Sequence, residues 1–146
     1  MLVYKFGGTS VGSVINMNHV KDIINNNDQK IVVLSAMSGT TNALVDISDF
    51  IKSNNTEAAI EHINTLNENY NTVVYDLLND KTLRQEVSNY VNVIFKNLIE
   101  ATKKIHNTQL HNAIVASGEL LSTYMFSRFL QQEGFKVALL PALDFM

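Results

Sequence analysis

The residues best suited to chemistry lie near the N-terminus, where a lysine is followed by two glycines and two hydroxyls. Lys5 interrupts an apolar run, and Gly7, Gly8, Thr9 and Ser10 come after it. An ammonium removed from water needs an anionic partner. Glycine loops expose backbone N–H groups and a helix N-terminus adds positive charge, so the arrangement suits phosphate oxygens. The order is neither that of a P-loop nor that of a dinucleotide-binding motif. A lysine that reaches solvent above an ordinary tight turn stays an open alternative.

Two further clusters follow predicted strands. Segment 35–42 carries hydroxyls, a glycine and an amide, including Ser35 and Thr41. Such groups bind polar small molecules, but they also cap helices, which is the commoner role. Ser117, Gly118 and Glu119 form the other cluster. A carboxylate in the first turn of a helix is kept ionised by the helix dipole and could hold an ammonium group, or it could be ordinary charge patterning.

The elements that must position these clusters are read from the hydrophobic pattern. Short β-branched runs predict strands, and apolar residues three or four apart predict helices. The predicted strands are 2–6, 30–35, 112–117 and 136–140, and the predicted helices begin near Val14, Leu44, Ala59, Leu83 and Glu119. Thr82 and Gln85 form a candidate capping box for the fourth helix.

Near-continuous apolar strands joined by helices predict an α/β fold with a parallel sheet covered on both faces. Five of the six glycines are placed in loops after strands, and Gly134 is placed at a left-handed helix C-cap. Ligands of such sheets bind outside the carboxyl ends of the strands. A cation with N–H donors, then hydroxyls, then an anion would together suit a phosphate and a zwitterion.

Composition narrows the classes of protein. The 146 residues make one domain of ordinary size, 46% hydrophobic, and a net charge of −3 gives no reason to expect nucleic acid. No apolar run is long enough to cross a membrane, and no leader segment is recognised. The absence of cysteine excludes disulfides and a catalytic thiol. His106 and His111 lack ligand spacing, no metal ligands are assigned, and Asp144 is most simply a solvated loop carboxylate. We expect a soluble, cytoplasmic domain.

Several of these segments resemble the aspartokinases. Residues 5–11, Lys-Phe-Gly-Gly-Thr-Ser-Val, are similar to the N-terminal signature of that family. Val32 to Ala36 with Thr41 and Asn42 resembles the family's second loop, and Ser117 to Leu120 with Ser122 resembles its third. The segments occur in the family's order and cover essentially the whole chain. The resemblance implies the three-layer αβα amino-acid kinase (carbamate kinase-like) fold with a mainly parallel sheet, incomplete in this chain.

The resemblance also implies an activity, the phosphorylation of the β-carboxylate of L-aspartate by ATP with Mg²⁺. The product is 4-phospho-L-aspartate, on the route to lysine, threonine and methionine. Lys5 would contact the ATP phosphates and neutralise charge on the transferring group. Gly7 and Gly8 would offer backbone N–H groups to the phosphates, with Thr9 and Ser10 nearby.

On the substrate side, the resemblance implies that Ser35 and Thr41 face the aspartate and the reacting phosphate. Glu119 would bind the aspartate ammonium. Phosphoryl transfer depends mainly on positioning and charge stabilisation, which agrees with the absence of a covalent nucleophile.

The chain differs from the family in length. Residues 1–146 would be the N-terminal part of the catalytic domain, without the C-terminal nucleotide-binding part and the ACT regulatory domains. We therefore expect this polypeptide alone to be inactive, and the full-length protein to be a homo-oligomer. The alternatives are another member of the superfamily, such as an acetylglutamate, glutamate 5- or uridylate kinase, or a non-catalytic ligand-binding module.

Overall fold

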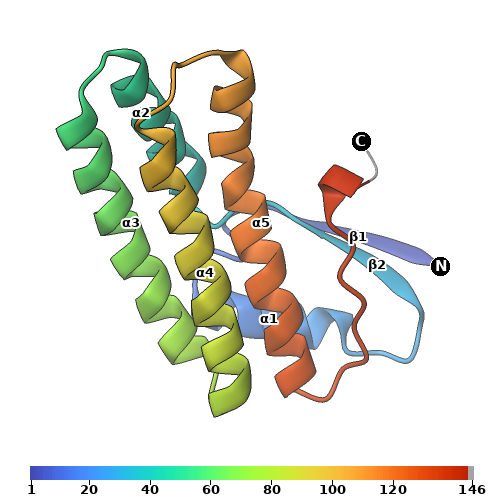
Figure 1. Ribbon diagram of the computed structural model, residues 1–146. Coiled ribbons are helices and arrows are strands. Elements are labelled where there is room, and N and C mark those ends of the chain that lie inside the picture. Colours follow the sequence, from blue (N-terminus) through green and yellow to red (C-terminus); the bar gives the residue numbers. More distant parts are fainter. Residues whose placement is uncertain (145–146) are drawn as a thin grey trace.

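The chain folds into a two-stranded parallel sheet packed beside a bundle of long helices, as the computed structural model of residues 1–144 shows (Figure 1). In chain order the elements are β1 (Leu2–Phe6), α1 (Val14–Ile24), β2 (Lys30–Leu34), α2 (Thr40–Lys52), α3 (Thr56–Leu77), α4 (Lys81–Ala101), α5 (Thr108–Gln132) and the 3₁₀ turn η1 (Ala142–Asp144). The first two strands and first four helices therefore agree with the sequence prediction, apart from their ends.

The sheet pairs β1 with β2 in parallel, with Leu2 opposite Lys30 and Phe6 opposite Leu34. One face packs toward the core through side chains such as Phe6 and Leu34. The other face is open, since Val3 is 67% exposed and Ile31 and Val33 are each 43% exposed. The expectation of a sheet covered on both faces is therefore wrong for the described residues.

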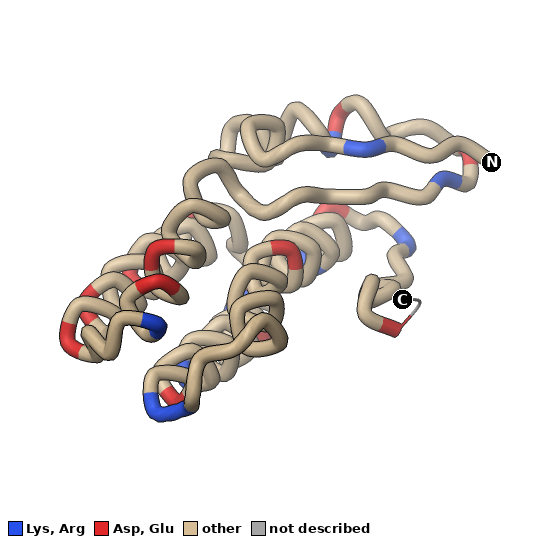
Figure 2. The backbone as a smooth tube through the Cα atoms, turned by 90° about the horizontal axis from the view of Figure 1, so that it is seen from above, with Lys and Arg blue, Asp and Glu red and all other residues tan. Residues whose placement is uncertain are grey.

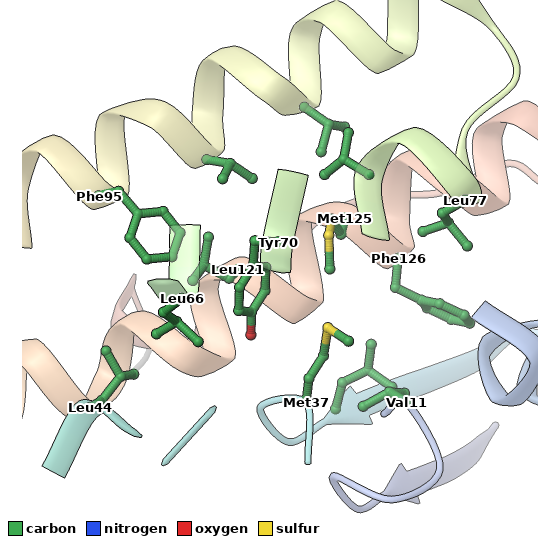
Figure 3. Close-up of a cluster of buried hydrophobic side chains, with 14 of the residues drawn as sticks. Val11, Met37, Leu44, Leu66, Tyr70, Leu77, Phe95, Leu121, Met125 and Phe126 are labelled. Carbon is green, nitrogen blue, oxygen red and sulfur yellow. The ribbon is translucent and has the colours of Figure 1, made fainter. Parts of the chain in front are cut away.

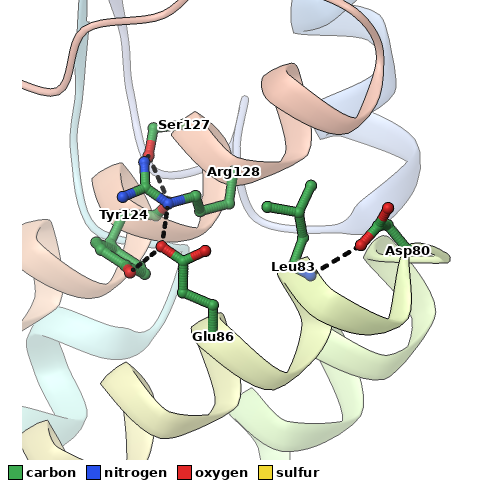
Figure 4. A network of polar contacts seen from close by, with 6 residues as sticks. All are labelled: Asp80, Leu83, Glu86, Tyr124, Ser127 and Arg128. Atoms are coloured by element: carbon green, nitrogen blue, oxygen red, sulfur yellow. Dashed lines mark hydrogen bonds and ion pairs between the residues drawn. The ribbon is translucent and has the colours of Figure 1, made fainter.

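Each of the helices α1, α3, α4 and α5 begins at a side chain that accepts a hydrogen bond from the third residue along. For α4 this residue is Asp80, whose Oδ1 accepts from the Leu83 N–H at 2.9 Å (Figure 4). The capping box predicted at Thr82 and Gln85 is thus wrong, because the helix starts before both. α4 ends at Ala101, and although Ile105 continues the apolar spacing of the helix in the sequence, it lies beyond this end and is 90% exposed.

The third predicted strand, 112–117, is wrong, because it lies inside α5. That helix begins at the cap Asn107 and buries Ile114, Ser117, Gly118 and Leu121. Spacings of three and four residues describe one helical stripe, and a short apolar run alone does not distinguish a buried helix from a strand. The helix predicted from about Glu119 is therefore the second half of a longer one.

The fourth predicted strand, 136–140, is also wrong, since none of its residues pairs with a strand within residues 1–144. Exposure nevertheless alternates along it, with Val137 partly buried and Lys136 exposed. The Gly134 prediction is confirmed. Its φ is +89°, and the Phe135 N–H closes the end of α5 by donating to the Leu130 carbonyl at 3.0 Å.

One apolar core joins the helices to the loops after the strands. Figure 3 shows Val11 and Met37 from these loops beside Met125 and Phe126 of α5. Acidic residues gather along α2 and α3 (Figure 2), and α3 carries Glu57, Glu61, Glu68 and Asp76 but no lysine or arginine. None of the helices within residues 1–144 is both long and apolar enough to cross a bilayer.

Candidate functional site

The first loop, residues 7–13 between β1 and α1, contains consecutive backbone N–H groups that donate no hydrogen bond within the described residues. The Ser10 N–H donates to the Gly7 carbonyl and the Gly12 N–H to the Thr9 carbonyl, at 3.1 and 3.2 Å. Within residues 1–144 the N–H groups of Gly7, Gly8 and Thr9 have no hydrogen-bond acceptor. The loop then leads into α1. Three consecutive free amides in the loop before a helix are donors of the kind that suits phosphate oxygens.

Lys5 precedes this loop on β1, but its side chain is exposed and lies on the open face of the sheet. Within residues 1–144 it forms no ion pair and no side-chain hydrogen bond. The prediction that its ammonium is removed from water is wrong here, because no layer covers that face in the described residues. What supports a role for Lys5 is its position next to the free amides.

The second loop packs directly against the first. The Ser35 N–H donates to the Phe6 carbonyl and the Ser38 N–H donates to the Gly8 carbonyl, both at 3.0 Å. A side chain at Gly8 would place its Cβ 2.7 Å from the Ala36 carbonyl oxygen, which is too close for any residue but glycine. The two loops are therefore in contact through their backbones.

Hydroxyls of the second loop do not cap α2. The N-cap is Gly39, with φ of +83°, and it has no side chain to accept a hydrogen bond. The capping interpretation of segment 35–42 is thus wrong. Ser38 is exposed beside the first loop. Thr41 is exposed and Ser35 is half-buried.

The third cluster lies in the middle of α5 rather than after a strand. A Cβ on Gly118 would come within 2.8 Å of the Ala36 Cβ, so this glycine permits a close crossing of helix and loop. One turn on, the Ser122 hydroxyl donates to the Ser35 carbonyl at 2.8 Å. Glu119 is exposed and does not lie in a first helical turn, so the helix-dipole argument for it is wrong.

The structure therefore brings the three predicted regions together at Ala36. The first loop contacts this residue through Gly8, and α5 contacts it through Gly118. Sequence reasoning did not identify Ala36 or Ser122 as the residues that join the clusters. The sequence did single out Gly118, but as a turn glycine. In the structure it allows α5 to pack closely against the second loop.

Two grooves lie on the elements around the loops, and neither is lined by Gly8, Ala36 or Gly118. One, of about 250 Å³, lies between the first loop and α1 and includes Thr9, Ser10 and Asn16. The other, of about 270 Å³, lies between α2 and α3 and includes Ala43 and Glu61. Neither is lined by Ser35, Thr41 or Glu119.

Two polar clusters lie elsewhere in the bundle. The sequence offered no reason to group His106 with His111. In the structure both rings form a hydrogen bond with the buried Ser48 hydroxyl, His106 through Nε2 and His111 through Nδ1, each at 2.9 Å. Between α4 and α5, Glu86 accepts from Arg128 at 2.9 Å and from the Tyr124 hydroxyl at 3.0 Å (Figure 4). The hydrogen bond from Arg128, then that from Tyr124, lowers the pKa of Glu86 below its ordinary value. These contacts hold helices together and do not reach the loop junction.

Carboxylates and histidines do not gather into a metal centre. Within residues 1–144 there is no group of three or more His, Cys, Asp or Glu side chains placed to hold a metal ion. The free amides suit phosphate oxygens, and residues 1–144 offer no metal centre built from protein side chains alone.

Comparison with known proteins agrees with the family resemblance of the loop sequences. Residues 1–145 match the model of the amino acid kinase family. The chain is 29% identical over 133 residues to lysine-sensitive aspartokinase 3 of Escherichia coli, covering 90% of this chain and 29% of that protein. It is also 29% identical to a bifunctional aspartokinase/homoserine dehydrogenase 2 of Arabidopsis thaliana, covering 97% of this chain and 16% of that protein.

Two solved structures extend the likeness to the fold. E. coli aspartokinase III in complex with aspartate and ADP matches with a TM-score of 0.76, and its complex with lysine and aspartate with 0.74. Each is 28% identical and covers 93% of this chain but only 30% of the solved chain. The architecture is thus an incomplete amino-acid kinase fold, and the chain spans about a third or less of these relatives.

Proposed function

Because this chain belongs to the amino acid kinase family, we propose that the full-length gene product transfers the γ-phosphoryl group of ATP to the β-carboxylate of L-aspartate. The product is 4-phospho-L-aspartate, which would feed lysine, threonine and methionine synthesis. The observation that carries the proposal is the row of free N–H groups at Gly7, Gly8 and Thr9 directly after Lys5.

In this proposal the first loop holds the nucleotide. Its free N–H groups donate to phosphate oxygens, with the Thr9 and Ser10 hydroxyls beside them. Lys5 lies one residue before the end of β1. Its ammonium neutralises the charge that develops on the phosphoryl group during transfer. Mg²⁺ would be bound by the ATP phosphates and would neutralise part of their charge, and no described residue is assigned as its ligand. Preorganised donors of this kind lower the barrier because they need no rearrangement when charge develops.

Aspartate is assigned to the other side of the junction. Ser35 and Thr41 face the substrate and the reacting phosphate, and the Glu119 carboxylate pairs with its ammonium. The exposure of Thr41 and Glu119 leaves both accessible to a ligand. The β-carboxylate oxygen attacks the γ-phosphorus while the bond to the β-phosphate oxygen breaks, so ADP leaves without a covalent enzyme intermediate.

We further propose that residues 1–146 are the N-terminal part of the catalytic domain, followed by the remaining nucleotide-binding part and ACT regulatory domains. The small share of each relative that the chain covers supports this assignment. The isolated chain is then inactive, and the full-length product is a cytoplasmic homo-oligomer.

A substrate panel tests the proposal. ATP consumption by the full-length gene product is measured with L-aspartate, L-glutamate, N-acetyl-L-glutamate and UMP in turn. We expect turnover that depends on L-aspartate and is at least about tenfold slower with the others, because a site built to pair a substrate's charges rejects analogues that misplace them. A preference for another acceptor would indicate a different superfamily member. Aspartate binding by calorimetry without turnover would indicate a ligand-binding module.

A further inference from the structure

The start of α2 is held from outside the helix. Its N-cap, Gly39, has no side chain, and its first turn is closed by two backbone bonds, from the Thr40 N–H to the Met37 carbonyl and from the Ala43 N–H to the Gly39 carbonyl. Thr41, which the proposed site uses, is the second residue of this helix. A contact that holds Thr40 in place therefore also orients Thr41, the next residue of the helix.

Tyr70 of α3 supplies this constraint. Its hydroxyl lies 2.7 Å from the Thr40 Oγ1, and the two residues are only 2% and 3% exposed. The ring packs against Phe95 of α4 at a centroid distance of 5.8 Å. In Figure 3 the Tyr70 oxygen points away from α3, toward the segment that carries Met37 and Leu44. Burial raises the pKa of Tyr70 to about 12, so the phenol is protonated throughout the neutral range.

The other end of the same loop is held in the same manner. The buried Ser122 hydroxyl of α5 donates to the Ser35 carbonyl at 2.8 Å. Between these two points, the Ser38 N–H donates to the Gly8 carbonyl. Segment 35–40 is thus fixed at each end by a buried hydroxyl and is joined in its middle to the phosphate side of the proposed site.

We propose that Tyr70 is a positioning residue of the aspartate site, which acts by holding Thr40 so that Thr41 faces the substrate. The inference rests on the proposed function for its catalytic consequence. Tyr70 itself touches no reacting atom in this scheme. Loss of its hydroxyl frees the start of α2, and the aspartate side of the site should lose affinity while the nucleotide side keeps it.

Two variants separate positioning from stability in the full-length gene product. Tyr70→Phe removes the hydrogen bond and leaves the buried Thr40 hydroxyl without its partner, which is itself destabilising. The double variant Tyr70→Phe/Thr40→Val removes both polar groups and keeps the Thr40 methyl that lies near Gly118. Its free energy of unfolding should therefore recover, although the link between α3 and α2 stays broken. Tyr124→Phe is the matched control, since it also loses a phenol hydrogen bond, but one made to Glu86 of α4 and not to the loop.

We expect the KM for L-aspartate to rise about fivefold in both Tyr70 variants and the KM for ATP to stay within twofold. A fivefold change corresponds to the binding free energy that one hydrogen bond contributes. The Tyr124→Phe control should change neither constant. If the double variant regains normal aspartate affinity together with its stability, Tyr70 is only a structural residue and the inference is wrong.

Hydrogen–deuterium exchange keeps the inference testable if aspartate proves not to be the substrate. In both Tyr70 variants, peptides covering 38–43 should exchange at least about fivefold faster, while peptides from α4 keep wild-type rates. Faster exchange without aspartate turnover would retain the positioning role and overturn the proposed function. Unchanged exchange at 38–43 would overturn the positioning role whatever the substrate.

Discussion

Replacement of Gly118 by alanine tests the crossing on which the candidate site depends. The new Cβ would lie 2.8 Å from the Ala36 Cβ and 3.3 Å from both the Leu44 Cδ1 and the Thr40 Cγ2. Unstrained carbon–carbon contacts are about 3.5–4.0 Å. Because the Ala36 Cβ is attached directly to the loop backbone, the clash can be relieved only if the loop and α5 move apart by about 1 Å.

Two opposing effects set the magnitude. Alanine in place of glycine inside a helix stabilises by about 1 kcal/mol. Overpacking of a buried contact typically costs about 1–3 kcal/mol. The net expectation for Gly118→Ala is a loss of about 0–2 kcal/mol, with the contact between Ser122 and Ser35 weakened by the same separation.

A double-mutant cycle measures the clash directly. The free energy of unfolding is obtained from urea titrations followed by circular dichroism for Gly118→Ala, Ala36→Gly and the pair. Ala36→Gly alone should cost about 1–2 kcal/mol through its lost methyl and added chain freedom. In the double variant the methyl group is on residue 118 instead of residue 36, so the two methyl groups no longer clash. We therefore expect a favourable coupling of about 1–2 kcal/mol. A single Gly118→Ala variant stabilised by the full helix-propensity gain, with no coupling to Ala36→Gly, would refute the close crossing.

Further predictions concern pH and the hydroxyl contacts. Because burial raises the Tyr70 pKa to about 12 from 10.0, this residue contributes stability that is complete below pH 10. The contribution is lost as the pH rises from 10 to 12, by about 2–3 kcal/mol, and urea titrations of Tyr70→Phe should show a flatter alkaline profile. The lowered Glu86 pKa has the opposite sign, so its contribution is present above pH 4.5 and is lost on acidification, and Glu86→Gln should weaken the acid dependence of thermal unfolding. Ser122→Ala should cost about 1 kcal/mol in the same titrations and speed exchange around Ser35, since it leaves a carbonyl without its donor.

Much of the fold could be predicted from local pattern. The short β-branched runs of β1 and β2 and the three- and four-residue spacing in α1 to α4 are local signals, and each describes its own element. Gly134 was predicted correctly for the same reason, because the positive φ at a helix end is a local requirement. Asp80 could have been recognised as the N-cap, since aspartate is among the strongest capping residues.

The errors arise where tertiary contacts decide. Segment 112–117 is a short apolar run that suits a strand or a buried helix equally, and only the cap at Asn107 separates the two. Gly118 looked like a turn glycine, but its role depends on Ala36, a residue far away in sequence. Lys5 was expected to be removed from water because it interrupts an apolar run in a sheet predicted to be covered on both faces, yet its face of the sheet is open in the described residues.

The meeting of the three clusters was predicted from the sequence, whereas the roles of their side chains stay predictions. Two of the three clusters follow strands as expected, and all three meet at Ala36. Residue types report chemistry, whereas their grouping in space depends on contacts between distant segments. The positioning contacts from Tyr70 and Ser122 were therefore invisible until the helices were placed.

The central claim is that the Lys5 ammonium and the loop amides after it receive the transferring phosphate. Aspartate-dependent ATP consumption by Lys5→Met in the full-length gene product tests it most directly, with Lys96→Met on the exposed face of α4 as the matched loss of one positive charge. The account predicts a fall in kcat of at least about 100-fold for Lys5→Met, as for removal of one preorganised charge at a transition state, and wild-type turnover for Lys96→Met. Turnover by Lys5→Met within twofold of wild type would contradict it.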